Sequence, residues 1–175
     1  MLEDFLKTAI KLKTIPRQGW INKLGLKDPE SVADHCYSMA VMAMMFSDLK
    51  KLDTEKIIKM TLLHDLAEAI TGDLTPDDAT KPKKEKMENH TMKKILANLP
   101  KSLKTEYEKL WMEYQQSNTK EAMLLHQIDK LEMALQAKSY KKMGYTKKQL
   151  GPFFDSAKKE ITDPELKKLF KKTLL

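Results

Sequence analysis

Four ionisable side chains interrupt segments of this sequence that are otherwise apolar. His35 lies in SVADHCYSMAVMAMM, His64 and Asp65 are neighbours in TLLHDLAEAI, and Asp129 lies in LLHQIDKLEMAL. A buried carboxylate is costly in free energy unless it is paired or ligates a cation. Two imidazoles and two carboxylates satisfy one another around a divalent ion, and this mixed nitrogen and oxygen set suits Mn, Co, Ni or Fe best, with Mg and Zn as alternatives. The pattern predicts one divalent metal held by these four residues.

Two further carboxylates follow the His64-Asp65 pair within nine residues. Glu68 comes three residues after Asp65, so on a continuous helix it would share the face of the pair. From there it could accept a proton from water without ligating the metal, and an ordinary exposed glutamate is the alternative. Asp73 directly follows Gly72, where it could act on water or substrate or only cap a turn. A weaker second ion held by Glu68 and Asp73 stays open.

The cations are distributed unevenly along the chain. All but one of the 32 cationic residues are lysine, and neither 28–49 nor 60–80 contains a lysine or an arginine. The exception is Arg17, in a loop rich in Pro and Gly, where a planar bidentate fork for phosphate would explain the choice of arginine. Trp20 could stack on a base or cap the pocket, or it could be a core residue.

The elements that must position these residues are helices, because the apolar period is helical nearly everywhere and no stretch alternates like a strand. The predicted fold is all-α. Helices are expected at about 2–13, 31–51, 53–70, 83–98, 102–115 and 119–142, with one or two more from Asp163-Pro164 onward; loops are expected at 14–26, 72–82 and 144–155. Capping boxes are predicted at Ser31 with Asp34 and at Asn118 with Glu121.

Length and composition predict a single domain spanning 1–175. The chain is 41% hydrophobic and 33% charged, and no apolar run reaches the length of a membrane span. The N-terminal segment does not have the pattern of a signal peptide, and one cysteine fits a reducing cytoplasm. The net charge of +7 invites a nucleic-acid partner, but the lysines are interspersed with glutamates as on solvated helix surfaces. The prediction is a cytoplasmic protein without a membrane or nucleic-acid partner.

Four blocks in order resemble one family. IPRQGW at 15–20, ESVADHCYSMAVMAM at 30–44, LLHDLAEAITGDLTP at 62–76 and HQIDKLEMALQA at 126–137 are similar to the 5′-deoxynucleotidase branch of the HD-domain phosphohydrolases, of the HD-domain-containing protein 2 type. The resemblance implies a compact, all-helical and usually dimeric enzyme. Its members use a divalent metal to release phosphate from deoxyribonucleoside 5′-monophosphates.

The resemblance also implies residue roles. It assigns His35, His64, Asp65 and Asp129 as metal ligands, Glu68 and Asp73 as the acids that act on water and substrate, and Arg17, Trp20 and Asp73 as substrate contacts. Arg and Trp are adjacent in the related bacterial enzymes, whereas two residues separate them here.

Other functions stay open at this point. A second HD-type activity, phosphodiesterase or nucleoside triphosphate hydrolase, would use the same metal site, and a basic helical protein that binds nucleic acid would not need it. His126 could serve a second metal, His90 lies in a charged run, and the segment 114–117 could line the pocket.

Overall fold

The computed structural model describes residues 1–174, and these form an all-α fold as predicted. The helices are α1 (Leu2–Lys11), the short 3₁₀ helix η1 (Leu12–Thr14), α2 (Gln18–Leu24), α3 (Val32–Lys50), α4 (Thr54–Leu63), α5 (Glu68–Thr71), α6 (Lys81–Leu96), α7 (Lys101–Gln116), α8 (Lys120–Lys142), α9 (Lys147–Glu160) and α10 (Pro164–Leu174). Within the described residues the only extended pairing is an isolated antiparallel bridge between Pro16 and Ser31.

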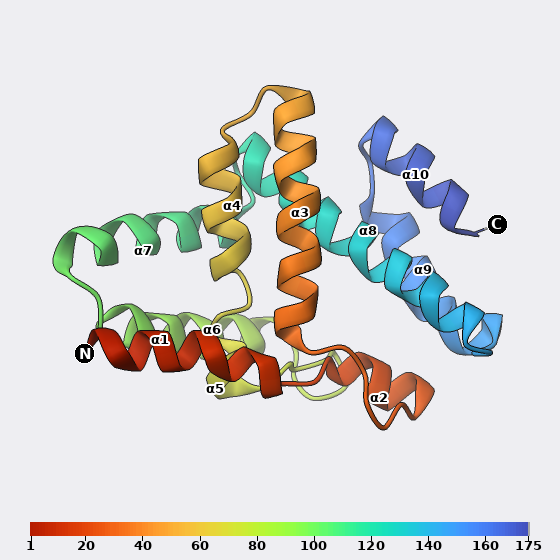
Figure 1. Ribbon diagram of the computed structural model, residues 1–175, viewed down its shortest axis with the longest axis horizontal. Helices are drawn as coiled ribbons and strands as arrows, with labels where there is room; N and C mark the ends of the chain where they lie inside the picture. The colour runs from red at the N-terminus through yellow and green to blue at the C-terminus, as the bar shows by residue number, and fades with distance from the viewer. Residues whose placement is uncertain (175) are drawn as a thin grey trace.

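Helix α3 stands at the centre of the molecule, packed against α4 and α8 (Figure 1). Its predicted capping box is confirmed: the Ser31 hydroxyl accepts the Asp34 N–H, and the Asp34 carboxylate accepts the Ser31 N–H. Apolar side chains of the three helices are almost completely buried, among them Met39 and Phe46 of α3, Ile57 of α4 and Ile128 of α8. This packing fixes three of the elements that carry the candidate site residues relative to one another.

The predicted continuous helix over 53–70 is wrong between Leu63 and Glu68, because α4 ends at Leu63 and α5 begins only at Glu68. Nδ1 of His64 lies 2.6 Å from the Thr61 carbonyl oxygen, the acceptor that the Asp65 N–H would use in a continuous helix. The backbone then forms tighter turns, in which the N–H groups of Leu66 and Glu68 donate to the carbonyls three residues earlier. Tight turns of this kind are common where an α-helix ends.

Two predicted loops contain helices. The segment 14–26 includes α2, which ends at Gly25 with a left-handed φ of 66°, and 144–155 includes the first half of α9. Both helices bury apolar side chains in a second, smaller core cluster: Trp20, Leu24, Leu26, Ala137, Tyr140 and Leu150. Tertiary burial thus stabilises the seven-residue α2, which would be marginal alone.

Helix caps explain the remaining differences. The Thr146 hydroxyl accepts the Gln149 N–H in a capping box that starts α9, and Pro152 lies inside this helix. Helix α8 is capped by Thr119, whose hydroxyl accepts the Ala122 N–H, and the predicted cap at Asn118 is wrong. Over the described residues, none of the helices has both the length and the apolar character needed to cross a membrane.

Candidate metal centre and active site

The loop that carries Arg17 is tied to the start of the helix that carries His35. On either side of the Pro16–Ser31 bridge, the Arg17 N–H donates to the Glu30 carbonyl at 3.0 Å and the Val32 N–H donates to the Ile15 carbonyl at 2.8 Å. His35 follows in the second turn of α3 and is completely buried. Segments 15–17 and 30–35 therefore reach the same region of the fold.

Three of the four predicted metal ligands converge there. One ligand atom each from His35, His64 and Asp65 lies within 4.8 Å of the other two. Nε2 of His64 lies 3.0 Å from Oδ2 of Asp65, and Nε2 of His35 lies 3.8 Å from the same oxygen. Both Nε2 atoms are buried and have no hydrogen-bond partner among the described residues. A cation held between them would satisfy both atoms.

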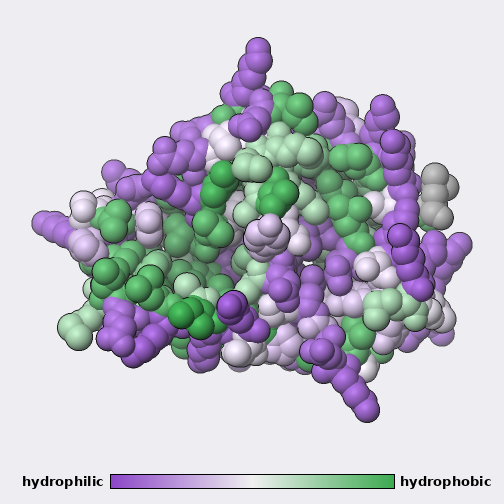
Figure 2. Space-filling model, viewed as in Figure 1, coloured by the Kyte–Doolittle hydropathy of each residue, from purple (hydrophilic) through white to green (hydrophobic). Residues whose placement is uncertain are grey.

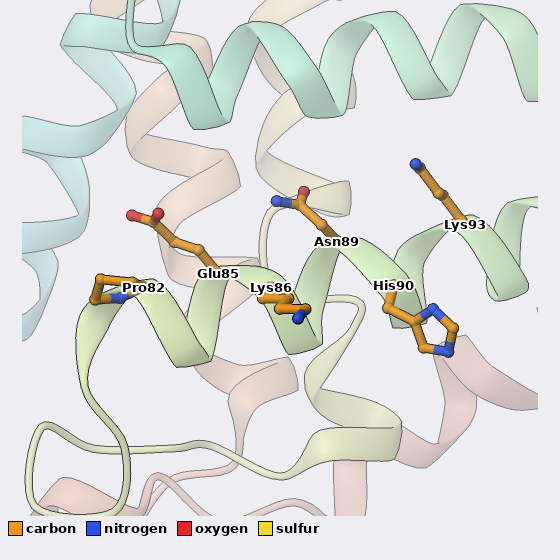
Figure 3. Close-up of a pocket in the computed structure, with 6 residues that line it drawn as sticks. All are labelled: Pro82, Glu85, Lys86, Asn89, His90 and Lys93. Atoms are coloured by element: carbon orange, nitrogen blue, oxygen red, sulfur yellow. The ribbon is translucent and has the colours of Figure 1, made fainter.

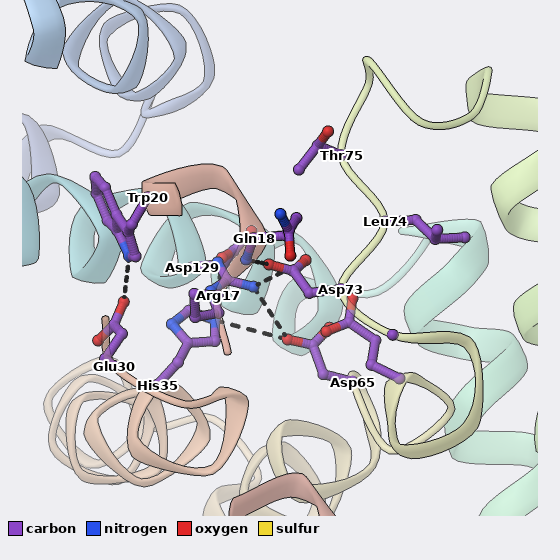
Figure 4. Close-up of polar contacts among 12 residues, drawn as sticks. Arg17, Gln18, Trp20, Glu30, His35, Asp65, Asp73, Leu74, Thr75 and Asp129 are labelled. Carbon is purple, nitrogen blue, oxygen red and sulfur yellow. Dashed lines mark hydrogen bonds and ion pairs between the residues drawn. The ribbon is translucent and has the colours of Figure 1, made fainter. Parts of the chain in front are cut away.

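Asp129 of α8 approaches His35, and Figure 4 draws both residues with Arg17, Asp65 and Asp73. Its Oδ1 lies 3.4 Å from Nε2 of His35, and its Oδ2 accepts a hydrogen bond from the Lys130 ammonium at 2.9 Å. Burial opposes ionisation of Asp129, but Lys130 and His35 outweigh it and hold the pKa of this carboxyl well below its usual value. Asp129 does not belong to the group of His35, His64 and Asp65, whose ligand atoms all lie within 4.8 Å of one another. Its role as the fourth ligand therefore stays a prediction.

The other nitrogen of each histidine is already engaged. Nδ1 of His64 lies 2.6 Å from the Thr61 carbonyl oxygen, and Nδ1 of His35 lies 2.6 Å from Oε2 of Glu132. A carbonyl can only accept, so Nδ1 of His64 carries the proton and Nε2 is left as a lone pair. Burial disfavours protonation of His35, but Asp129 and Glu132 outweigh it and raise its pKa to about 10. The site therefore favours positive charge, as a divalent ion would supply, and its donor set fits such an ion.

Arg17 lies at the edge of the acidic group. Its NH1 is 3.7 Å from Oδ2 of Asp65 and 3.7 Å from Oδ1 of Asp73, and the side chain is 16% exposed. Burial alone would lower the pKa of Arg17, but Asp73 and Asp65 raise it above its ordinary value. Asp73 also accepts the backbone N–H of Gln18 at 2.7 Å, which fastens the loop after α5 to the start of α2.

Glu68 is buried beside the same cluster. Its Oε1 lies 3.2 Å from Nζ of Lys84, while its Oε2 is buried without a partner among the described residues. Burial, reinforced by Asp65 and Asp73, raises the pKa of Glu68 well above the usual glutamate value. The folded protein therefore holds a proton on Glu68 more tightly than an exposed glutamate would hold it. An exposed surface glutamate, the alternative for this position, is ruled out by its burial.

Trp20 lies in the core beside the site. Its side chain is 2% exposed, its ring packs 4.0 Å from that of Phe153 and 5.0 Å from that of Tyr140, and its Nε1 donates to Oε1 of Glu30 at 2.8 Å. This placement supports the core alternative for Trp20, and a contact with substrate stays a prediction. Burial, together with nearby Glu132, raises the pKa of Glu30 to about 7.

The remaining histidines lie apart from the three converging ligands. The ring of His126 stacks on Tyr114 at 4.2 Å, and its Nε2 lies 2.9 Å from the Tyr114 carbonyl oxygen. Tyr114 is buried and its ring meets that of His64 edge-on at 5.6 Å, which places it beside the site as the sequence allowed. His90 borders an open hollow of about 460 Å³ along α6, whose lining is charged and lies outside the metal group (Figure 3).

Several polar partners of the site were not predicted, among them Lys130, which binds Asp129, and the two residues Glu132 and Lys84. Glu132 lies three residues after Asp129 on α8, so its sequence spacing carried a usable signal. Lys84 belongs to the charged run KPKKEKMENH, and nothing in the sequence separates it from its neighbours. Its ammonium binds Glu68 and donates to the Leu74 carbonyl at 2.9 Å, and it lies 3.5 Å from Glu88, so only the fold reveals its role.

The sequence of this chain is similar to those of known proteins. The sequence model of the HD domain matches residues 9–169. The chain is 41% identical over 177 residues to the 5′-deoxynucleotidase HDDC2 of Dictyostelium discoideum, an alignment that covers 95% of this chain and 93% of that protein. It is 38% identical over 169 residues to the Homo sapiens 5′-deoxynucleotidase HDDC2, covering 96% and 82%.

A solved structure agrees with these sequence matches. A conserved hypothetical protein from Pyrococcus furiosus is 34% identical and superposes with a TM-score of 0.81 over 97% of each chain. The segment 9–169, which matches the HD domain model, includes the four predicted metal ligands His35, His64, Asp65 and Asp129. From its sequence and its helical architecture alike, this chain belongs to the HD domain family.

Proposed function

We propose that this protein is a metal-dependent phosphomonoesterase that hydrolyses deoxyribonucleoside 5′-monophosphates to deoxynucleoside and phosphate. One observation carries the proposal: two buried histidines present unpartnered Nε2 atoms to Asp65, and Arg17 lies at the edge of that group. A cation site next to a guanidinium suits a phosphate monoester. The names of the relatives, 5′-deoxynucleotidase, support the reaction and the substrate class.

Each residue has a separate task in this proposal. His35, His64, Asp65 and Asp129 hold a divalent ion, which supplies Lewis acidity toward the phosphoryl group and water. Glu68 takes the proton of the attacking water on its free Oε2. Arg17 binds the phosphate oxygens through its planar fork, and Asp73 holds that fork in place.

The decisive experiment is phosphate release from a panel of ribo- and deoxyribonucleoside mono-, di- and triphosphates, with Mn²⁺, Co²⁺, Ni²⁺, Fe²⁺, Mg²⁺ and Zn²⁺ added in turn. Deoxyribonucleoside monophosphates should be the preferred substrates, and chelation should abolish turnover. Preference for triphosphates or cyclic diesters would replace the proposal by one of the other HD-type activities. A fully active metal-free protein would refute the site assignment.

The same proposal includes a homodimer of one-domain subunits, 1–175. Helix α1 has an exposed apolar stripe at Leu2, Leu6 and Ile10, with exposed fractions of 53%, 54% and 65%. Hydrophobic atoms gather over this helix in Figure 2. Contiguous exposed apolar surface is typical of association sites, and light scattering on the purified protein tests the subunit count.

Location and nucleic-acid binding are also part of the proposal. The cytoplasmic location rests on the single cysteine, Cys36, which is buried. Some lysines form ion pairs with acids one helical turn away, such as Lys7 with Glu3 and Lys59 with Glu55. Such pairs support solvated helix surfaces rather than a nucleic-acid face.

A further inference from the structure

The buried side of His35 that faces away from the metal group contacts a single carboxylate. Nδ1 of His35 lies 2.6 Å from Oε2 of Glu132, the side chain of His35 is fully buried, and that of Glu132 is 5% exposed. Nε2, across the same ring, is the atom that lacks a partner and lies near Asp65 and Asp129. The ring thus connects a carboxylate at one nitrogen to the candidate metal site at the other.

We propose that Glu132 is a positioning residue: its carboxylate accepts the Nδ1–H of His35, fixes the tautomer, and aims the Nε2 lone pair at the metal. This inference rests on the proposed metal site. A carboxylate bound to the far nitrogen of a ligating histidine sets the ring orientation and increases the basicity of the ligand. Glu132 would therefore strengthen metal binding without touching the ion.

The position of Glu132 on α8 supports this role. It lies three residues after Asp129, so both carboxylates project from nearly the same face of one helix toward α3. Asp129 meets Nε2 and Glu132 meets Nδ1 of the same imidazole. One rigid helix therefore sets both a candidate ligand and the orientation of a second ligand, which couples the packing of α8 against α3 to the geometry of the site.

Glu30 also approaches Glu132 and His35, and the ligand atoms of the three lie within 4.8 Å of one another. A second ion there would require His35 to bind through both ring nitrogens, and hence to lose both ring protons. Instead, Oε1 of Glu30 is engaged by the Trp20 indole at 2.8 Å, and its backbone N–H donates to the Tyr140 hydroxyl. Glu30 thus belongs to the wall of the site and offers a matched control for Glu132.

The test is the affinity for Mn²⁺, measured by electron paramagnetic resonance of the free ion, for the wild type, Glu132→Gln and Glu30→Gln. Both substitutions preserve side-chain volume and remove one carboxylate near His35, which is buried in Glu132 and partly buried in Glu30. Glu132→Gln should raise the Mn²⁺ dissociation constant by about 10- to 100-fold. Glu30→Gln should change this constant by less than about 3-fold, because Oε1 of Glu30 accepts a hydrogen bond from Trp20. Equal affinities of the wild type and a folded Glu132→Gln protein would overturn the inference.

A second measurement does not depend on a variant that folds. With Zn²⁺ bound, long-range ¹H–¹⁵N spectra of the wild-type protein should show a proton on Nδ1 of His35 and none on Nε2. A proton on Nε2 would refute the role of Glu132 regardless of any mutant. Absence of metal binding by the wild type would overturn both the site and this inference. Metal binding without phosphate release would refute only the proposed reaction.

Discussion

His64 shows how one side chain contributes both to chemistry and to the backbone that positions it. Its Nδ1 engages the Thr61 carbonyl, the acceptor that a continuing helix would offer to Asp65. The regular helix stops there, and Asp65 lies in the following turn, close to Nε2 of both histidines. Because the helix ends just before His64, the adjacent side chains of His64 and Asp65 can point into the same site.

The distinct tasks of Asp65 and Glu68 predict different effects of their loss. Asp65→Ala should abolish bound metal and turnover, because Asp65 is one of the three converging ligands. Glu68→Gln should retain the metal and lower kcat by about 100- to 10,000-fold, since it removes only proton transfer. Elemental analysis and steady-state kinetics on both variants separate the two roles. Loss of metal from Glu68→Gln would show instead that Glu68 is a ligand.

We expect the substitution Arg17→Lys to lower catalytic efficiency although it keeps the positive charge. Lysine retains the positive charge that Asp65 and Asp73 require but lacks the planar fork. Arg17→Lys should therefore lower kcat/KM for deoxynucleoside monophosphates by about 10- to 100-fold, the equivalent of one or two charged hydrogen bonds. Lys23→Arg, at an exposed position paired with Asp77, is the matched control. Unchanged kinetics of Arg17→Lys would leave no role for the fork.

At the scale of elements, the start of α3 connects stability to the site. The Ser31 cap, the Asp34 carboxylate and the bridge to Pro16 all lie within one turn of His35. The long α3 could be predicted because its capping box precedes a continuous apolar run. The seven-residue α2 and the helix α9 could not, since both bury apolar side chains, Trp20 and Leu150, against distant parts of the chain.

Removing the cap of α3 gives a prediction for this element. Ser31→Ala should lower the free energy of unfolding by about 1 kcal/mol and the Tm by roughly 2–4 °C for a domain of this size. The Asp34 N–H loses its side-chain acceptor while the metal ligands stay in place. Ser102→Ala, at an exposed position in the first turn of α7, should have no comparable effect in the same thermal scans.

At the scale of the whole molecule, the site is assembled from segments that are far apart in sequence. Arg17 precedes α2, His35 lies on α3, the His-Asp pair follows α4, and Asp129 lies on α8.

The acids gathered there make stability depend on pH. Glu30 is the clearest case, because its pKa is raised to about 7 by burial and by Glu132.

The sign of this dependence follows from proton binding. A raised glutamate pKa means that the folded chain holds the Glu30 proton more tightly than the unfolded chain does, so stability falls as pH rises from about 4.5 to about 7. In EDTA, the Glu30→Gln variant should gain about 1–3 kcal/mol relative to the wild type between pH 5 and pH 8. Urea denaturation at each pH measures the difference. A difference that does not change with pH would show that Glu30 titrates normally.

The sequence by itself determined the all-α class, the long helices and the four polar residues in apolar segments, because the helical period and the polarity of each segment are local properties. The roles of Glu132 and Lys84, the end of α4 at Leu63 and the burial of Trp20 were decided only by the tertiary structure. Each depends on a partner from another helix or on a side chain that competes for a backbone carbonyl. Local spacing, such as that between Asp129 and Glu132, can place a side chain on one face of a helix, but it does not identify the partner on another element until the chain is folded.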